Sequence, residues 1–169
     1  MKYLTAAFFL IFIHSVGNCA DIYYGNWVFS VNENSFLLAT TNQSGESMLL
    51  ACQPDNDVCE WGISLKIGCD INHNYIMLIS APDGIVSAKT VCARSVGNGK
   101  SVQYVHKFID TNIVSLLGDK QGYVGFAIGL QDGTFQISRF SLNGLSDGFA
   151  ALDKLLQSYK ASSTKTKYM

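Results

Sequence analysis

Charged residues are scarce in this sequence of 169 residues. They make up 15% of it, whereas about 25% is usual for soluble proteins. Once Lys2 is removed with the leader described below, 11 basic and 13 acidic side chains remain, a net charge of −2. Nucleic acids and anionic membrane surfaces attract a strongly basic face. The sequence therefore gives no electrostatic basis for binding either of them.

Long apolar runs are missing after the N-terminus. Lys2 is followed by one apolar run from Leu4 to Val16 and then by small and polar residues. This layout is typical of a secretory signal peptide, and the run is shorter than the roughly 20 residues that a transmembrane helix needs. We therefore predict a leader at residues 1–20, an exported protein of the periplasm or cell surface, and no transmembrane segment in the mature chain.

Cys19 leaves an alternative at the cleavage region. A lipid-anchored cysteine normally follows a small residue, and Asn18 fits that pattern poorly. Cleavage after Cys19 would place Gly17 and Cys19 at the third-last and last positions, where leader peptidase prefers small residues. A soluble product is favoured over a lipid anchor at Cys19.

Motifs for catalysis and for metal binding are also missing. The sequence contains no G-x-S-x-G turn, and Asp55, Asp57 and Glu60 lack the spacing and central glycine of a calcium loop. His106 lies in the alternating run VQYVHKF, where packing is expected, although a buried imidazole near Asp110 could titrate near neutrality. We predict no enzyme, cofactor or metal. A hydrolase whose site forms only in space, around His106, is one alternative.

An even set of four cysteines remains after the leader. In an exported protein such a set predicts two disulfides, and four cysteines allow three pairings. Cys52–Cys59 and Cys69–Cys92 are favoured, because each bond would join a plausible hairpin. The CX6C, CX9C and CX22C spacings differ from the short knuckles of zinc sites, which are the rival interpretation.

Short β-strands dominate the rest of the pattern. The best hairpin signal is Pro82-Asp83-Gly84 between two β-rich runs, and a short helix or turn is expected around Asp110 to Leu117. Many short strands with regular turns predict an antiparallel β-sandwich or partly closed barrel. The predicted strands cover 26–31, 35–41, 47–52, 58–67, 75–80, 85–92, 102–108, 123–129 and 134–140.

The last element changes to a helical period. Four residues fall on one helical face, and Ser146 or Asp147 can cap the helix. We predict one β-rich domain at 21–160 with a single C-terminal α-helix, followed by a polar tail at 161–169. The helical face consists of Phe149, Leu152, Leu156 and Tyr159. The predicted core residues are Trp27, Trp61, Phe140, Leu142 and Phe149.

Three features in order resemble the bacterial invasion-associated locus B family. Tyr24-Gly25-Asn26-Trp27 is similar to its Tyr-Gly-Asp-Trp start, and Cys92 with the following strand region precedes Asp132-Gly133. The segments 140–144 and 148–152 are similar to its closing Ser-Leu-x-Gly-Phe-x-Ala-Ala-Leu. The resemblance implies an exported, β-rich, non-enzymatic envelope protein of a Gram-negative bacterium, linked in some members to host-cell entry.

The chain also departs from that family. Val31 or a neighbour stands where the family has a cysteine after the tryptophan, and a second cysteine beyond Cys92 is absent. Leu145 to Asp147 are inserted, and the segment CQPDNDVCEW has no counterpart in the family.

The resulting functional prediction is binding to another protein or an envelope component, without catalysis. Recognition residues on rigid scaffolds lie mainly in exposed loops, and QPDND and SVGNGK are the best loops available. A periplasmic inhibitor or immunity protein of a secreted hydrolase is the alternative that small size and disulfides fit equally well. The candidate binding residues are Asp55, Asn56, Asp57, Asn98 and Lys100.

Overall fold

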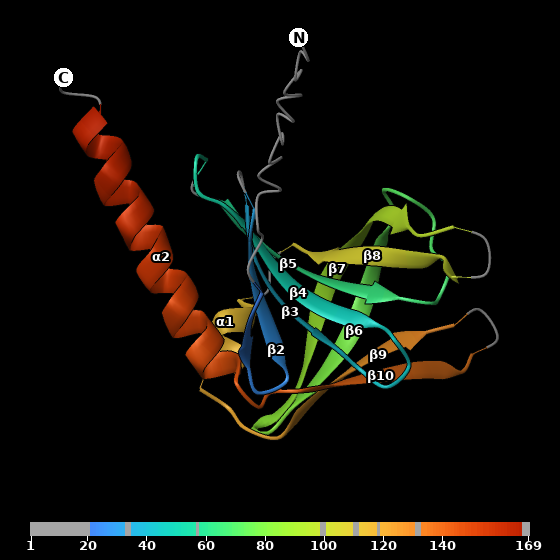
Figure 1. Ribbon diagram of the computed structural model, residues 1–169. Coiled ribbons are helices and arrows are strands. Elements are labelled where there is room, and N and C mark those ends of the chain that lie inside the picture. Colours follow the sequence, from blue (N-terminus) through green and yellow to red (C-terminus); the bar gives the residue numbers. More distant parts are fainter. Residues whose placement is uncertain are drawn as a thin grey trace, which may run out of the picture.

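The protein is a mainly β structure with one long C-terminal helix (Figure 1). The computed structural model describes residues 21–32, 35–56, 58–98, 101–109, 112–117, 119–130 and 133–166. Ten described strands form one open antiparallel sheet in the order β1-β2-β3-β4-β5-β8-β7-β6-β9-β10. The elements are β1 (Ile22–Tyr24), β2 (Trp27–Asn32), β3 (Ser35–Thr41), β4 (Ser47–Gln53), β5 (Val58–Leu65), β6 (Asn74–Ala81), β7 (Gly84–Val96), β8 (Gln103–Phe108), α1 (Ile113–Leu117), β9 (Tyr123–Gly129), β10 (Phe135–Ser141) and α2 (Leu145–Thr166).

The sheet curls so that its last strand, β10, approaches the turn between β3 and β4, and a side chain instead of a strand ladder joins them. Glu46, in the turn between β3 and β4, is 2% exposed. Its carboxylate accepts hydrogen bonds from Ser138 Oγ at 2.6 Å and Gln136 Nε2 at 3.2 Å, both on β10. The backbone N–H of Lys66 donates to the same carboxylate at 3.3 Å. These bonds hold the open sheet in a curl, which agrees with the partly closed barrel, one of the two architectures that the strand pattern predicts.

The core lies inside this curl, where alternate residues of each strand point. Trp27, Trp61, Phe140 and Leu142 are buried there as predicted. Phe149 is half-buried, and its ring meets that of Trp61 edge-on with centroids 5.6 Å apart. Aromatic rings of this size supply much of the apolar area that a domain buries.

Both favoured disulfides are confirmed. Cys52 and Cys59 are directly opposite each other in the β4–β5 hairpin. Cys69 follows β5 and bonds to Cys92 of β7, because the segment before β6 runs beside β7. There the N–H of Asn72 donates to the carbonyl of Cys92 at 2.7 Å. Cysteine spacing alone does not decide among the three possible pairings.

Most predicted strand boundaries differ from the observed ones by one or two residues, and larger differences occur at β1, β7 and α2. β1 was not anticipated, and β7 continues to Val96 because a register shift between Cys92 and Arg94 lets the strand pass the expected break. The cap prediction at Ser146 or Asp147 is wrong, since α2 already begins at Leu145. α2 also runs to Thr166, six residues past the predicted end.

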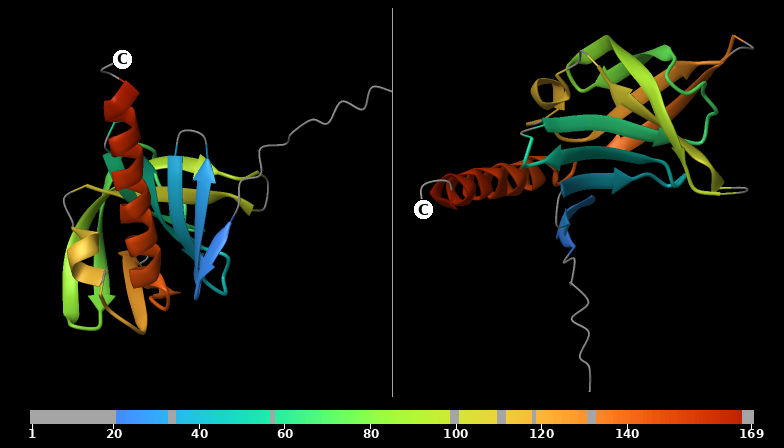
Figure 2. Two further views of the ribbon diagram at one scale, coloured as in Figure 1. Left: turned by 60° about the vertical axis from the view of Figure 1, so that its left-hand side comes forward. Right: turned by 90° about the horizontal axis from the view of Figure 1, so that it is seen from above.

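The helix α2 packs on the β1–β3 end of the sheet as far as Tyr159, and its last turns extend past the sheet (Figures 1 and 2). Leu145 and Leu152 are buried, while Leu156 and Tyr159 pack on the core from its rim. A Cβ at Gly148 would lie 2.7 Å from Leu38 Cδ1, so the helix approaches the sheet closely at this point. Neither described helix is long and apolar enough to cross a membrane.

The two ends of the domain meet through the segments that carry the family resemblance. The N–H of Asn26 donates to the carbonyl of Asn143 at 3.0 Å. The indole Nε1 of Trp27 donates to the carbonyl of Ser141, also at 3.0 Å. Residues more than 110 positions apart are therefore held together by these bonds, and both motifs have a structural role.

Candidate binding groove

The outer face of β6, β7, β9 and β10 carries large apolar side chains that nothing in the described chain covers. The outer face of an antiparallel sheet is usually polar, and contiguous exposed apolar patches often mark interaction sites. We call this surface the outer apolar face. Its large apolar residues, between 41% and 70% exposed, are Ile76, Leu78, Ile85, Tyr123, Phe135 and Ile137.

The strand register arranges the middle of this face in two rows. Leu78, Ala127 and Ile137 form an apolar row across β6, β9 and β10. The adjacent row along the strands contains Ser80, Gly125 and Arg139. Successive same-face residues of a strand lie about 7 Å apart. An apolar strip and a polar strip therefore run side by side across the same three strands.

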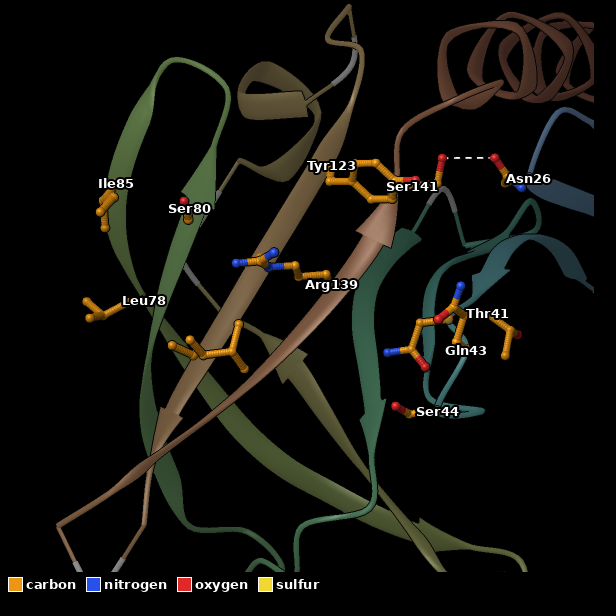
Figure 3. A pocket seen from close by; sticks show the side chains of 14 residues that line it. Asn26, Thr41, Gln43, Ser44, Leu78, Ser80, Ile85, Tyr123, Arg139 and Ser141 are labelled. Carbon is orange, nitrogen blue, oxygen red and sulfur yellow. Dashed lines mark hydrogen bonds between the residues drawn. The ribbon is translucent and has the colours of Figure 1, made fainter.

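These rows form the floor of a groove of about 880 Å³ (Figure 3). Gly125 and Ala127 leave the floor low, because they carry no long side chain. The opposite wall is the β3–β4 turn, from which Gln43 and Ser44 contribute. Ligand sites have typical volumes of about 300–1,000 Å³, so the groove has the size of a small ligand or a short peptide segment.

Arg139 is the charged side chain among the described residues that line the groove. It reaches from β10 across β9 toward Ser80 (Figure 3). Its Cγ would lie 3.9 Å from a Cβ at Gly125, an ordinary contact distance, so the Arg139 side chain runs close over this position of β9. No described acidic side chain forms an ion pair with Arg139. An exposed guanidinium with free donors is therefore available to an anion.

The outer apolar face has a positive bias. The sequences of β6, β7, β9 and β10 contain no aspartate or glutamate, but they include Lys89, Arg94 and Arg139. Lys89 lies on β7 opposite Ile76 of β6, outside the groove. The charges that belong to this part of the sheet are thus of one sign.

One end of the groove is bounded by a hydrogen-bonded pair. Ser141 Oγ donates to Asn26 Oδ1 at 2.9 Å, and the amide of Asn143 also approaches that oxygen, at 3.4 Å. The ring of Tyr123 stands beside this pair (Figure 3). The contact of Asn26 with Ser141 and Asn143 therefore also forms the end wall of the groove.

The first predicted binding loop lies elsewhere, at the tip of the β4–β5 hairpin. The Asp55 carboxylate accepts a hydrogen bond from the Tyr159 hydroxyl of α2, and this bond raises the pKa of Tyr159. Asn56 Nδ2 donates to Gln53 Oε1 at 3.2 Å. Asp57 lies outside the described residues. Asp55 and Asn56 therefore make contacts within the protein, and their role in binding stays a prediction.

The second predicted loop, between β7 and β8, is at the other end of the sheet. Val58, at the start of β5, adjoins the first loop, whereas Leu65, at its end, pairs with Tyr104 near the start of β8. Asn98 accepts through its carbonyl from Ser101 N–H at 3.2 Å, and Lys100 lies outside the described residues. The structure does not bring the two loops together, and no described residue of either lines the groove.

His106 is packed inside the protein. Its side chain is fully buried, and both ring nitrogens lack a hydrogen-bond partner among the described residues. The Tyr75 ring meets it edge-on with centroids 5.4 Å apart. Burial lowers its pKa from 6.5 to about 4, because the charged imidazolium is desolvated. Asp110 lies outside the described residues. A sealed imidazole is poorly placed to accept a proton from a substrate.

Metal-binding clusters are not found in the described ranges, where no three His, Cys, Asp or Glu side chains come together as ligands would.

The groove was missed by sequence reasoning, although one signal for it existed. Ile76 to Ile79 are four apolar residues in succession, so both faces of β6 are apolar. Such a strand predicts that both faces become covered. The strands that lie beside β6 on the outer face follow from the order of the sheet. This order brings distant parts of the chain together, so a local sequence pattern does not contain it.

Comparison with known proteins supports the fold. No protein-family model matches the sequence, and no curated protein matches it either. Among solved structures, the chain is similar to invasion associated protein B from Bartonella henselae, with a TM-score of 0.59 and 16% identity. The match covers 82% of this chain and 99% of that one. The resemblance read from the sequence motifs is thus confirmed at the level of the fold, and the chain has the architecture of that invasion associated protein.

Proposed function

We propose that this is an exported bacterial envelope protein that binds another protein through its outer apolar face, without catalysis, in an interaction with a host. The observation that carries the proposal is the outer apolar face itself. Ile76 and Ile137 are 57% and 59% exposed on adjoining parts of one sheet face. Leaving such surface in water costs roughly 25 cal/mol per Å², and a bound partner would remove this cost.

Export is supported by the covalent structure. Disulfides persist in oxidising compartments and are rare in a reducing cytoplasm, and the two bonds Cys52–Cys59 and Cys69–Cys92 fit an exported protein. The predicted leader at residues 1–20 lies outside the described residues. The periplasm and the cell surface both remain within the proposal.

The connection with a host comes from the similarity in fold. The solved structure that this chain resembles is named as an invasion associated protein. Folds are shared by proteins of different function, so this connection is carried to the present chain as part of the proposal.

Site-specific photo-crosslinking in the intact envelope tests the proposal. A photo-reactive amino acid replaces Ile76, on the outer apolar face, and in a matched variant it replaces the exposed Lys154 of α2, which packs against β1–β3. We expect a discrete protein adduct from position 76 and none from position 154. Equal adducts from both positions, or none from position 76, would contradict the proposal. A stoichiometric adduct with one secreted hydrolase would instead favour the inhibitor alternative.

A further inference from the structure

We propose that the groove binds the free carboxyl terminus of a partner polypeptide whose last residue is apolar, with the carboxylate on Arg139. The inference rests on the proposed function and identifies the part of the partner that enters the groove.

The charge of the groove selects an anion. Arg139 has no acidic partner among the described residues, and its planar guanidinium can hold a carboxylate through two parallel hydrogen bonds. A second copy of this chain would bring like charges together, because β6, β7, β9 and β10 supply only basic residues. Charge complementarity therefore favours a partner with a negative group over self-association.

The apolar row selects the group next to that anion. Leu78, Ala127 and Ile137 lie one same-face step, about 7 Å, from the row that contains Arg139. In an amino acid at the end of a chain, the α-carboxylate and the aliphatic side chain are attached to the same Cα, so they can contact two adjacent rows at once. The carboxylate can thus bind Arg139 while the side chain packs on the apolar row.

The shape of the groove favours a chain end over a continuous segment. Beyond Arg139 the groove is bounded by Tyr123 and the Asn26–Ser141 pair. On the opposite wall, the Gln43 and Ser44 side chains have no hydrogen-bond partner within the described chain, so they can bind the last peptide groups of the ligand. A lipid bilayer is flat on this scale, and it would not fill a groove bounded by the β3–β4 turn.

Fluorescence anisotropy with the mature protein tests the inference. The probe is a labelled hexapeptide that ends in alanine and leucine with a free carboxyl group, and the comparison peptide is its C-terminal amide. We expect the free acid to bind at least ten-fold more tightly. Arg139→Gln should weaken the free acid to the level of the amide, whereas the matched Lys89→Gln should change its affinity less than two-fold. Ala127→Leu should reduce binding of both peptides by filling the groove.

Three results would overturn the inference. They are equal binding of acid and amide, equal effects of Arg139→Gln and Lys89→Gln, and binding to phosphatidylglycerol vesicles that both variants weaken alike. Both basic side chains are exposed, so thermal unfolding of the variants should match that of the wild type and exclude misfolding. A protein adduct retained at position 76, together with any of these three results, would remove this inference and leave the proposed function standing.

Discussion

The two faces of the β9–β10 hairpin place the same residue type in opposite surroundings. Phe126 of β9 points inward, is 2% exposed, and lies 5.8 and 5.9 Å from the ring centroids of Phe108 and Phe140. Phe135 of β10 points outward and is 64% exposed. The inner ring holds the fold together, and the outer ring is available to a partner. Hydrophobicity alone therefore does not distinguish the residues that stabilise this protein from those that we expect to bind.

The largest expected effect comes from truncating the inner ring. Phe126→Ala removes a fully packed side chain and leaves a cavity, so we expect a loss of about 3–5 kcal/mol in the free energy of unfolding. Phe135→Ala, the matched change on the outer face, should cost less than about 1 kcal/mol. Urea unfolding followed by tryptophan fluorescence measures both. Similar losses for the two variants would break the comparison between the faces.

Acidification should lower the stability of the protein through the buried His106, which lies on the inner side of the sheet. The pKa of His106 is about 4 in the folded protein and 6.5 without burial. Between these values the unfolded state binds the extra proton, so stability is complete above pH 6.5 and falls as the pH decreases toward 4. The loss is up to about 3 kcal/mol. Urea unfolding at pH 7 and pH 4.5 should show it.

Two histidine variants serve as controls for that measurement. His106→Leu should remove this component of the pH dependence, whereas His73→Leu, at an exposed position, should retain it. An unchanged pH dependence in His106→Leu would show that other groups cause the acid sensitivity.

Substitution of Glu46 should cost less stability than truncation of the inner ring and more than a change on the outer apolar face. Glu46→Ala leaves the buried Ser138 hydroxyl and the Lys66 N–H without their acceptor, so we expect a loss of about 2–3 kcal/mol. Glu60→Ala is the matched control, because it breaks only an exposed ion pair with Lys107, and such pairs contribute about 1 kcal/mol or less. Thermal unfolding measures both. Equal, small losses would show that the side-chain bridge to β10 does not hold the curl.

The smallest effect on stability is expected on the outer apolar face. Ile76→Ser exchanges an exposed apolar side chain for a polar one, and we expect a change within about 0.5 kcal/mol in the isolated protein. In the envelope the same change should reduce capture of the partner, measured as the yield of the adduct from a photo-reactive residue at position 137. A variant that unfolds but still captures the partner would reverse the assignment of this face.

Much of the fold was predictable because its signals are local. β3 and β9 agree with their predicted bounds, the favoured disulfides are present, and the face of α2 with Leu152 packs on the core. Turn residues and alternation act within a few positions of the chain. The start of α2 was misplaced because it depends on a distant contact. A Cβ at Gly144 would lie 1.9 Å from the Tyr24 carbonyl oxygen, so β1 determines how the chain enters the helix.

By itself, the sequence determined the strand periods, the apolar faces, the even set of cysteines and the lack of acidic residues in β6, β7, β9 and β10. Only the tertiary structure decided which apolar face became the core, and it placed Arg139 beside Leu78 and the β3–β4 turn. The physical reason is that the alternation of apolar and polar residues only assigns a side chain to one face of its strand. Strand order and sheet curl then decide whether that face meets the interior or the solvent, and contacts such as Glu46 to Ser138 stabilise the curl.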